Sequence, residues 1–226
     1  NEVFLHQQFF GWQIETELPN FNVEAATMMD FNVHQHTSVN FAYVLPFSPK
    51  NALVEITSFC QQKYHANTLK QSLENYLAAT INGPFTVQKV EEAAIPMTSH
   101  PFNRYSPEGA INIGTAAGKI KPTTGYAFHR IFKDSALLAD CFFNGVQPPA
   151  LVHNRFFMYD SLLLKLLLQK PASAKAVLQQ LFQRVPYATI LRFLDEDTDL
   201  WNEAKIFLQL PKKDLVKLFI QQGISW

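Results

Sequence analysis

One acidic side chain stands alone in an apolar, strand-like segment of the chain. Glu55 is the only ionisable residue between Asn51 and Phe59. Alternation along a strand would place Glu55 on one face together with Leu53 and Thr57. Burial there would raise the pKa of the carboxyl, and an acid catalyst needs a carboxylic acid that is still protonated near neutral pH. The alternative is a solvent-facing glutamate on a half-exposed strand.

Two other features could contribute chemistry near the same region. Asp30 is isolated after two methionines and is the second candidate acid. His34 and His36 lie two residues apart and could bind a metal from one face of a strand. No third ligand follows at a spacing known from metal sites, so surface or loop histidines are the favoured interpretation and we expect no metal.

A run of small residues follows a short apolar segment near the middle of the chain. Ala110–Gly114 predicts a strand, and the residues after it lead into a helix expected from about Tyr126 to Phe143. Small residues let a backbone approach a ligand closely, and a helix N-terminus offers free N–H groups to an anion. Thr124 is the expected N-cap. The segment indicates a nucleotide phosphate site or, alternatively, a tight strand-to-helix turn with its cap.

The usual opening of a dinucleotide site is missing from this sequence. Gly-x-Gly-x-x-Gly occurs nowhere, and the first glycine is Gly11 beside Trp12. The chain begins Asn1-Glu2-Val3-Phe4, without a methionine, and we expect it to lie inside a longer natural protein.

Strand-forming residues dominate the first sixty positions that must hold the candidate acids. The patterns predict an extended segment over 21–31 and a hairpin whose arms are Asn40–Phe47 and Ala52–Phe59. The turn Ser48-Pro49-Lys50-Asn51 would join the two arms. A further strand is predicted over Thr86–Val90.

Helical periodicity first occurs after these sixty positions and dominates after Gln147-Pro148-Pro149. Leu69, Leu73 and Leu77 recur at helical spacing behind Asn67, the expected N-cap. Strands followed by helices, with one strand-loop-helix unit between them, indicate the α+β class. Beyond the prolines the predicted helices are Leu162–Leu168, Ala174–Gln183, Tyr187–Leu194 and Lys212–Gln222.

Composition and charge exclude several classes of function. Hydrophobic residues make up 47% and aromatic residues 13% of the chain, which is typical of a folded core and would suit a large apolar ligand. The formal net charge is +0, so nucleic acid is not an expected partner. Cys60 and Cys141 form no disulfide framework, which favours a reduced, cytoplasmic compartment. No apolar run reaches the roughly 18 residues that a bilayer span requires.

Six motifs, in order along the chain, resemble those of the lycopene cyclase family. The family patterns are Met-Asp-Trp/Phe, Phe-x-Tyr-x-x-Pro-Phe-Ser, Phe-Leu-Glu-Glu-Thr-Ser, Ile-Pro-Met, Ile-Gly-Gly/Thr-Ala-Gly with Pro-Ser/Thr-Thr-Gly-Tyr, and Arg-x-Phe-x-x-Asp-x-x-Leu-Leu. The matching segments here are Met29-Asp30-Phe31, Phe41–Ser48, Leu53–Ser58, Glu92–Met97, Ile113–Gly118 with Lys121–Tyr126, and Arg155-Phe156-Phe157 with Asp160 and Leu162-Leu163.

The resemblance implies a flavoprotein of the two-dinucleotide-binding-domain superfamily, which pairs a flavin domain with a sheet-based substrate domain. This chain would be its C-terminal portion, without the Gly-rich fingerprint. Residues 1–105 would form most of the substrate sheet, 106–145 a flavin-contacting strand-loop-helix, and 146–226 a helical region. Contacts to FAD are implied at Gly114, Thr115, Ala116, Gly118, Pro122, Thr123, Thr124, Gly125 and Tyr126.

The resemblance also implies a reaction in carotenoid biosynthesis. Lycopene cyclases close the linear ends of lycopene into β-ionone rings by an acid-initiated, redox-neutral isomerisation. Glu55 would be the essential acid, with Asp30 as the second candidate. Reduced FAD would stabilise the cationic transition state, and NAD(P)H would keep the flavin reduced. Residues 1–226 alone are expected to be inactive. Substrate contacts are implied at Phe41, Tyr43, Pro46 and Met97.

Two departures from the family pattern leave the ring type, β or ε, open. Ile56 replaces the second acid that plant members carry, which favours a bacterial-type enzyme, and Asn32 stands where many members have arginine. A related FAD-dependent monooxygenase or oxidoreductase of apolar substrates is one alternative function. An inactive, ligand-binding fragment is another.

The substrate's lipid solubility also favours a membrane surface as a partner. The last helices carry apolar residues against several lysines, so such a helix could lie in the membrane interface of a peripheral cytoplasmic protein. Packing of these residues onto the protein core is the alternative. The apolar residues are Leu208, Leu210, Leu215, Leu218 and Phe219.

Overall fold

The structure is a computed structural model that describes residues 2–35 and 37–221. Contacts within the chain divide it into two compact units. Within the described residues, the sheet unit comprises 5–96 and 167–175, and the helical unit comprises 2–4, 97–166 and 176–221. The functional segments predicted from sequence stay predictions, since a division by contacts does not test them.

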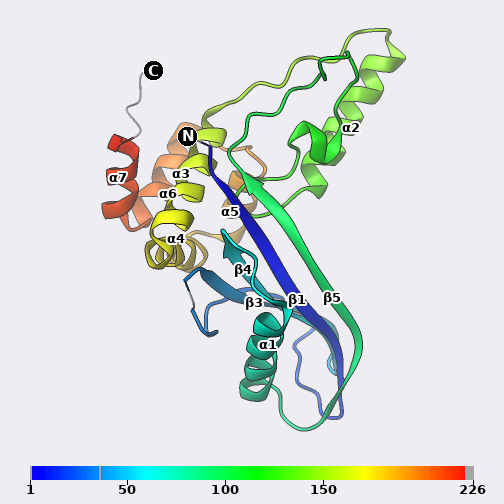
Figure 1. The fold of residues 1–226 in the computed structure, drawn as a ribbon, viewed down its shortest axis with the longest axis vertical. Coiled ribbons are helices and arrows are strands. Elements are labelled where there is room, and N and C mark those ends of the chain that lie inside the picture. The colour runs from blue at the N-terminus through cyan, green and yellow to red at the C-terminus, as the bar shows by residue number, and fades with distance from the viewer. Residues whose placement is uncertain (1, 36, 222–226) are drawn as a thin grey trace. The chain divides into compact units, whose positions relative to one another are not determined.

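Five strands form one sheet in the order β2-β3-β4-β1-β5 (Figure 1). The edge strand β5 is longer than its predicted core of Thr86–Val90, because it lies beside the thirteen-residue strand β1. Pro96 is tolerated in β5 because an edge strand has a free side that needs no N–H donor. The strands are β1 (Phe4–Thr16), β2 (Thr27–Asp30), β3 (Val39–Ser48), β4 (Asn51–Cys60) and β5 (Phe85–Thr98).

The predicted hairpin is confirmed as β3 and β4. The two strands pair antiparallel, with Tyr43 opposite Glu55. The hydroxyl of Ser48 accepts the backbone N–H groups of Lys50 and Asn51, at 3.2 and 3.0 Å, and so holds the turn. Since register is fixed on both sides of the turn, every side chain of β4 has a defined face.

Helix α1 (Ala66–Thr80) covers one face of the sheet. Leu69, Leu73 and Leu77 are at most 1% exposed and pack with sheet residues that include Ile56. Each buried leucine contributes about 1.5–3 kcal/mol, so this face forms the core of the unit. The predicted cap, Asn67, is wrong, because His65 is the N-cap and its ring nitrogen accepts the N–H of Asn67.

One predicted strand is mostly irregular. Of the extended segment predicted over 21–31, only Thr27–Asp30 forms a strand. The side chain of Asn22 accepts the N–H of Glu24, and the carbonyl of Asn22 accepts the N–H of Ala25. This local turn competes with strand pairing for the same backbone groups.

The helical unit follows β5 through an irregular segment. The α+β class is confirmed in its coarse form, as a sheet followed by helices. Helices predicted after the proline breaker are present, although Gln222 lies outside the described residues, and α6 was not predicted. The elements are a 3₁₀ turn η1 (Gly114–Ala117), α2 (Phe128–Phe143), α3 (Arg155–Gln169), α4 (Pro171–Arg184), α5 (Tyr187–Leu194), α6 (Leu200–Gln209) and α7 (Lys212–Gln221).

Two expectations about the start of α2 are wrong. Ala110–Gly114 is not a strand, because only Ile111 makes a bridge, to Tyr105, before the chain turns at Gly114. Helix α2 begins at Phe128, two residues later than expected, and its N-cap is Ala127. The hydroxyl of Thr124 instead accepts the N–H of Tyr126 in a local turn.

Candidate functional site

Glu55 occupies the centre of the sheet, on the face opposite α1. It pairs with Gly11 on β1 and with Tyr43 on β3. Val54 and Ile56 point into the α1 core, as the predicted alternation requires. The hydroxyl of Thr57, two residues along the same face, donates to Glu55 Oε1 at 2.9 Å.

The surroundings of this carboxyl are apolar and aromatic. Phe41 is fully buried on the same face, and its ring meets Tyr43 edge-on at 5.0 Å and Phe59 at 5.1 Å between centroids. Desolvation by burial raises the pKa of Glu55 from 4.5 to about 7, against the lowering effect of the Thr57 hydrogen bond. Among the described residues no ion pair involves Glu55, so no cation offsets that desolvation.

Asp30 lies on the other face of the sheet. It pairs with Ala42, a member of the α1 core, and its Oδ2 accepts the hydroxyl of Tyr76 from α1 at 2.9 Å. Its Oδ1 accepts the backbone N–H of Asn32. The structure therefore does not bring the two candidate acids together, and its contacts make Asp30 an anchor between β2 and α1.

The implied substrate contacts divide in the same way. Phe41 and Tyr43 share the face of Glu55, whereas Pro46 pairs with Ala52 of the α1 core and faces the other side. Met97 is fully buried and belongs to the helical unit. Only Phe41 and Tyr43 therefore lie beside the candidate acid within one unit.

The predicted phosphate loop is an open turn in its first half. Gly114 has φ +54°, and a Cβ added there would meet nothing within 4 Å. Thr115 and Ala116 are exposed in the 3₁₀ turn that follows. Gly118 has φ +62°, and an added Cβ would lie 2.5 Å from the ring of Phe102. The backbone is therefore open at Gly114 and tightly backed at Gly118.

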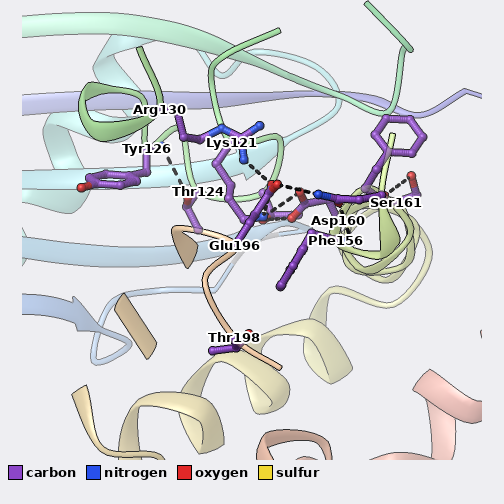
Figure 2. A network of polar contacts seen from close by, with 12 residues as sticks. Lys121, Thr124, Tyr126, Arg130, Phe156, Asp160, Ser161, Glu196 and Thr198 are labelled. Atoms are coloured by element: carbon purple, nitrogen blue, oxygen red, sulfur yellow. Dashed lines mark hydrogen bonds and ion pairs between the residues drawn. The ribbon is translucent and has the colours of Figure 1, made fainter. Parts of the chain in front are cut away.

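The second half of the loop is tied down by buried polar groups. Lys121 and Thr123 are each 2% exposed, and both donate to the carboxylate of Asp160 on α3, at 2.9 and 2.8 Å. Figure 2 shows Lys121 between the carboxylates of Asp160 and Glu196. The Thr123 hydroxyl is thus committed to the protein, while Thr124, Gly125 and the exposed Tyr126 remain as surface of the loop.

Glu196 accepts the remaining hydrogen bonds of this network. It accepts from Lys121 at 3.4 Å, from Arg130 on α2, and from Asn154 at 3.2 Å. Its backbone has φ +61°, the one positive φ at a non-glycine residue within the described residues. Burial acts to raise the pKa of Glu196, but Lys121 and Arg130 outweigh it and hold the value below the ordinary range.

A second cluster fixes the approach to the loop from β5. Arg104 and Asp134 are almost fully buried and form a two-point ion pair, which Lys119 joins at 3.0 Å from Asp134. Arg104 also donates to the carbonyl of Asn112. Sequence inspection missed both ends of this pair, since an arginine and an aspartate thirty residues apart carry no local signal.

No metal centre accompanies these groups in the part of the chain that the structure describes. Across residues 2–35 and 37–221, no three His, Cys, Asp or Glu side chains lie where they could hold one ion. His36 lies outside the described residues, so the His34 and His36 pair is not compared.

The comparisons with known proteins decide the family. The model of the family described as "Lycopene cyclase protein" matches residues 2–218. The chain belongs to the lycopene cyclase family. A lycopene beta-cyclase of Paracoccus sp. (strain N81106 / MBIC 01143) is 25% identical over 224 residues, which cover 91% of this chain and 56% of the relative.

A solved structure supports the fold of this lycopene cyclase family member. A geranylgeranyl bacteriochlorophyll reductase-like protein from Thermoplasma acidophilum aligns with a TM-score of 0.52 and 14% identity, over 96% of this chain and 55% of that protein. At this identity the likeness shows the fold alone. The chain spans about half the length of these relatives.

Two residues of the last lycopene cyclase motif, Arg155 and Asp160, make polar contacts with buried side chains in the structure. Arg155 holds Glu203 of α6 by two nitrogens, at 2.7–3.0 Å, and Glu203 is 1% exposed. Asp160, one helical turn further along α3, holds the loop through Lys121 and Thr123. The motif thus anchors α6 and the loop to one helix.

Proposed function

We propose that Glu55 is the acid that starts ring closure of a linear carotene such as lycopene, in the natural protein at its full length. The observation that carries this proposal is the state of its carboxyl. It lies on an aromatic sheet face without a cationic partner among the described residues, and burial raises its pKa to about 7. A carboxyl with that pKa is about half protonated at neutral pH and largely protonated one pH unit below it, so it can give up a proton there.

The hydrogen bond from Thr57 supports a defined direction for the proton. Because Thr57 donates to Oε1, that oxygen is the acceptor and the acidic proton belongs on Oε2. Oε2 would transfer the proton to the terminal double bond of the carotene. The electron pair of that bond forms the new C–H bond and leaves a tertiary carbocation.

The neighbouring double bond then attacks the cation and closes a six-membered ring. Loss of one proton from the ring carbon gives the cyclic end group, so the proton balance is zero and the product is an isomer. Aromatic faces stabilise cations within about 6 Å of their centroids. Phe41 and Tyr43 are two of the aromatic residues that share the face of Glu55, which supports this role for them.

FAD is the cofactor that we propose for the loop. Gly114 offers open backbone, Thr115, Ala116 and Tyr126 are exposed, and Thr124 and Gly125 are half-buried. Gly118 and Thr123 support the loop from behind. Bound in its reduced form, FAD would supply negative charge that favours a developing cation. NAD(P)H as the source of its electrons is part of the same proposal.

The β-ionone ring is the proposed product, following the name of the Paracoccus relative.

Contact with a membrane surface is proposed because a carotene dissolves in lipid. In the described residues no helix combines the length and apolarity that crossing a bilayer requires. Of the helix residues considered for a membrane face, Leu208 is 67% exposed whereas Leu210 and Leu218 are buried, so packing takes up part of that stripe.

The decisive experiment is Glu55→Gln in the full-length natural protein, assayed without oxygen and with chemically reduced flavin. The amide keeps the volume and cannot deliver the proton, so ring closure should fall more than about a thousandfold, roughly 4 kcal/mol. Asp30→Asn is the matched control and should stay within about threefold of the natural rate, because Asp30 faces α1.

Mass analysis of the product separates the alternatives. A cyclic product with the mass of the substrate supports the proposal. A product that carries added oxygen, or an absolute need for oxygen, would favour a monooxygenase. If Glu55→Gln keeps more than about a tenth of the rate, a loss below ~1.4 kcal/mol, the acid is another residue.

A further inference from the structure

Gly11 is unusual because it occupies the middle of a long, regular strand. Glycine weakens a strand interior unless a turn, a bulge or a close approach requires it. Gly11 does not have the positive φ found at six other glycines, including Gly114 and Gly118. It pairs in regular register with Glu55, between the pairs Phe10–Ile56 and Trp12–Val54. Backbone conformation therefore does not explain this glycine.

Space explains it. A Cβ on Gly11 would lie 3.2 Å from Glu55 Cβ, 3.3 Å from Glu55 Cγ and 3.3 Å from the carbonyl oxygen of Val54. Cβ atoms of directly opposed residues in an antiparallel pair ordinarily lie about 4.5–5.5 Å apart. The Cβ and Cγ atoms of Glu55 thus lie closer than an ordinary contact to the place where any other residue at position 11 would have its Cβ.

The pair partners of Glu55 on its two sides differ. On β3 the opposing residue is Tyr43, whose ring packs with Phe41. Along β4, Thr57 holds Oε1 by its hydroxyl. On β1 the opposing residue has no side chain. We propose that Gly11 is a positioning residue, which directs the Glu55 carboxyl over β1 by leaving that space empty; this inference rests on the function proposed for Glu55.

The position over β1 has an electrostatic consequence. The strand on the far side of β1 is β5, which carries Glu91, and the charge of Glu91 adds to burial in raising the pKa of Glu55. The hydroxyl of Thr57 acts in the opposite direction. Lys89, also on β5, pairs with Glu91 at 2.6 Å. A methyl group at position 11 would push the carboxyl away from β1 and therefore away from Glu91.

The test is Gly11→Ala in the full-length natural protein, with two readouts. The first is the rate of ring closure as a function of pH. The rate should fall about tenfold, because the proton donor is displaced by a few tenths of an ångström. Its high-pH decline should move down by about half a pH unit, because the carboxyl leaves both Glu91 and the desolvated position. The second is the infrared band of the protonated Glu55 carboxyl, which should titrate with the same displacement.

The infrared band is identified by its absence in Glu55→Gln. Gln13→Ala is the control, since Gln13 lies on the same strand and face but pairs with Leu53, and both readouts should stay unchanged. An unaltered rate and titration in Gly11→Ala would overturn the inference. So would a loss of rate with the infrared titration unmoved, since that would make the glycine merely structural.

Two further outcomes are separable. If Glu55→Gln remains active, the proposed function fails, and the infrared titration alone decides whether Gly11 positions the side chain. If Gly11→Ala does not fold, Gly11→Ala/Glu55→Ala should fold, because Cγ and the carboxyl are gone. A double variant that also fails to fold would assign the glycine to the two contacts that remain, with the Cβ of residue 55 and the Val54 carbonyl, and would overturn the inference.

Discussion

The sheet unit half-buries the carboxyl of Glu55 and the helical unit fully buries that of Glu203, and the two groups have different surroundings. In the sheet unit, Glu55 has one neutral hydrogen-bond donor, Thr57, and a like charge at Glu91. In the helical unit, Glu203 receives Arg155, Tyr159 and Thr198. Burial raises the pKa of Glu55 to about 7. Burial acts in the same direction at Glu203, but the Arg155 hydrogen bond and the other partners outweigh it and lower the pKa.

The difference separates two uses of a buried acid. A buried carboxylate with matched cations and donors holds elements together, and breaking it leaves partner charges without compensation. A buried carboxyl without such partners remains protonated near neutral pH and keeps a transferable proton. In the helical unit, Asp134, Glu196 and Glu203 are used in the first way, because their partners hold the pKa of each carboxyl below its ordinary value. At Asp160 burial outweighs the partners and raises the pKa. The second use is the one proposed for Glu55.

The largest effect is expected where a buried cation would lose its nearest acid. Asp160→Ala leaves the ammonium of Lys121, which is 2% exposed, with only the more distant Glu196 carboxylate. The free energy of unfolding should fall by about 3–5 kcal/mol. Chemical denaturation measures this, with the exposed Asp140→Ala as a control expected within about 0.5 kcal/mol. A loss below about 1 kcal/mol for Asp160→Ala would mean that the network does not hold the helical unit together.

An intermediate effect is expected from the amide at Glu55, with a sign set by pH. The folded pKa of about 7 lies above the ordinary 4.5, so the stability linked to this group is present below pH 4.5 and is lost as pH rises through 7. Glu55→Gln lacks that loss. Relative to the natural protein it should therefore gain about 2 kcal/mol between pH 5 and pH 8, measured as unfolding free energy.

Glu203→Gln should change the free energy of unfolding with pH in the opposite direction to Glu55→Gln. Its lowered pKa contributes stability above about pH 4.5, which is lost as pH falls through the folded pKa. The amide should therefore cost about 2–3 kcal/mol at pH 7 and less in acid. If both amide variants shift stability in the same direction with pH, the distinction between compensated and uncompensated acids is wrong.

The smallest effect is expected at Thr57. Its hydroxyl lowers the pKa of Glu55, so Thr57→Val should raise that pKa and extend ring closure to higher pH by less than about one unit. The rate at pH 6 should stay within about threefold, because the acid is already protonated there. A pH–rate profile measures both quantities, and a decline that moves to lower pH would reverse the assigned role of the hydroxyl.

The sequence allowed much of the sheet unit to be predicted from local patterns. Alternation over Asn51–Phe59 correctly separated Glu55 from Ile56, and leucine spacing correctly predicted α1. The errors fell at 21–31 and Ala110–Gly114, where apolar or β-branched residues suggested strands. In both places side-chain or backbone hydrogen bonds within a turn replaced pairing with a neighbour. Strand propensity cannot foresee such competition, because it describes single residues.

The sequence by itself determined the family, the β3–β4 hairpin, α1 and most of the C-terminal helices, and the isolation of one acid among apolar residues. Those properties depend on residue type and on the fixed periods of helix and strand. Only the tertiary structure decided that Gly11 lies opposite Glu55, that Asp30 faces α1, and that the Thr123 hydroxyl serves Asp160. These depend on register and on contacts between distant segments. Whether a buried carboxyl is compensated follows from those contacts, since charge and hydrogen bonding act through space and not along the chain.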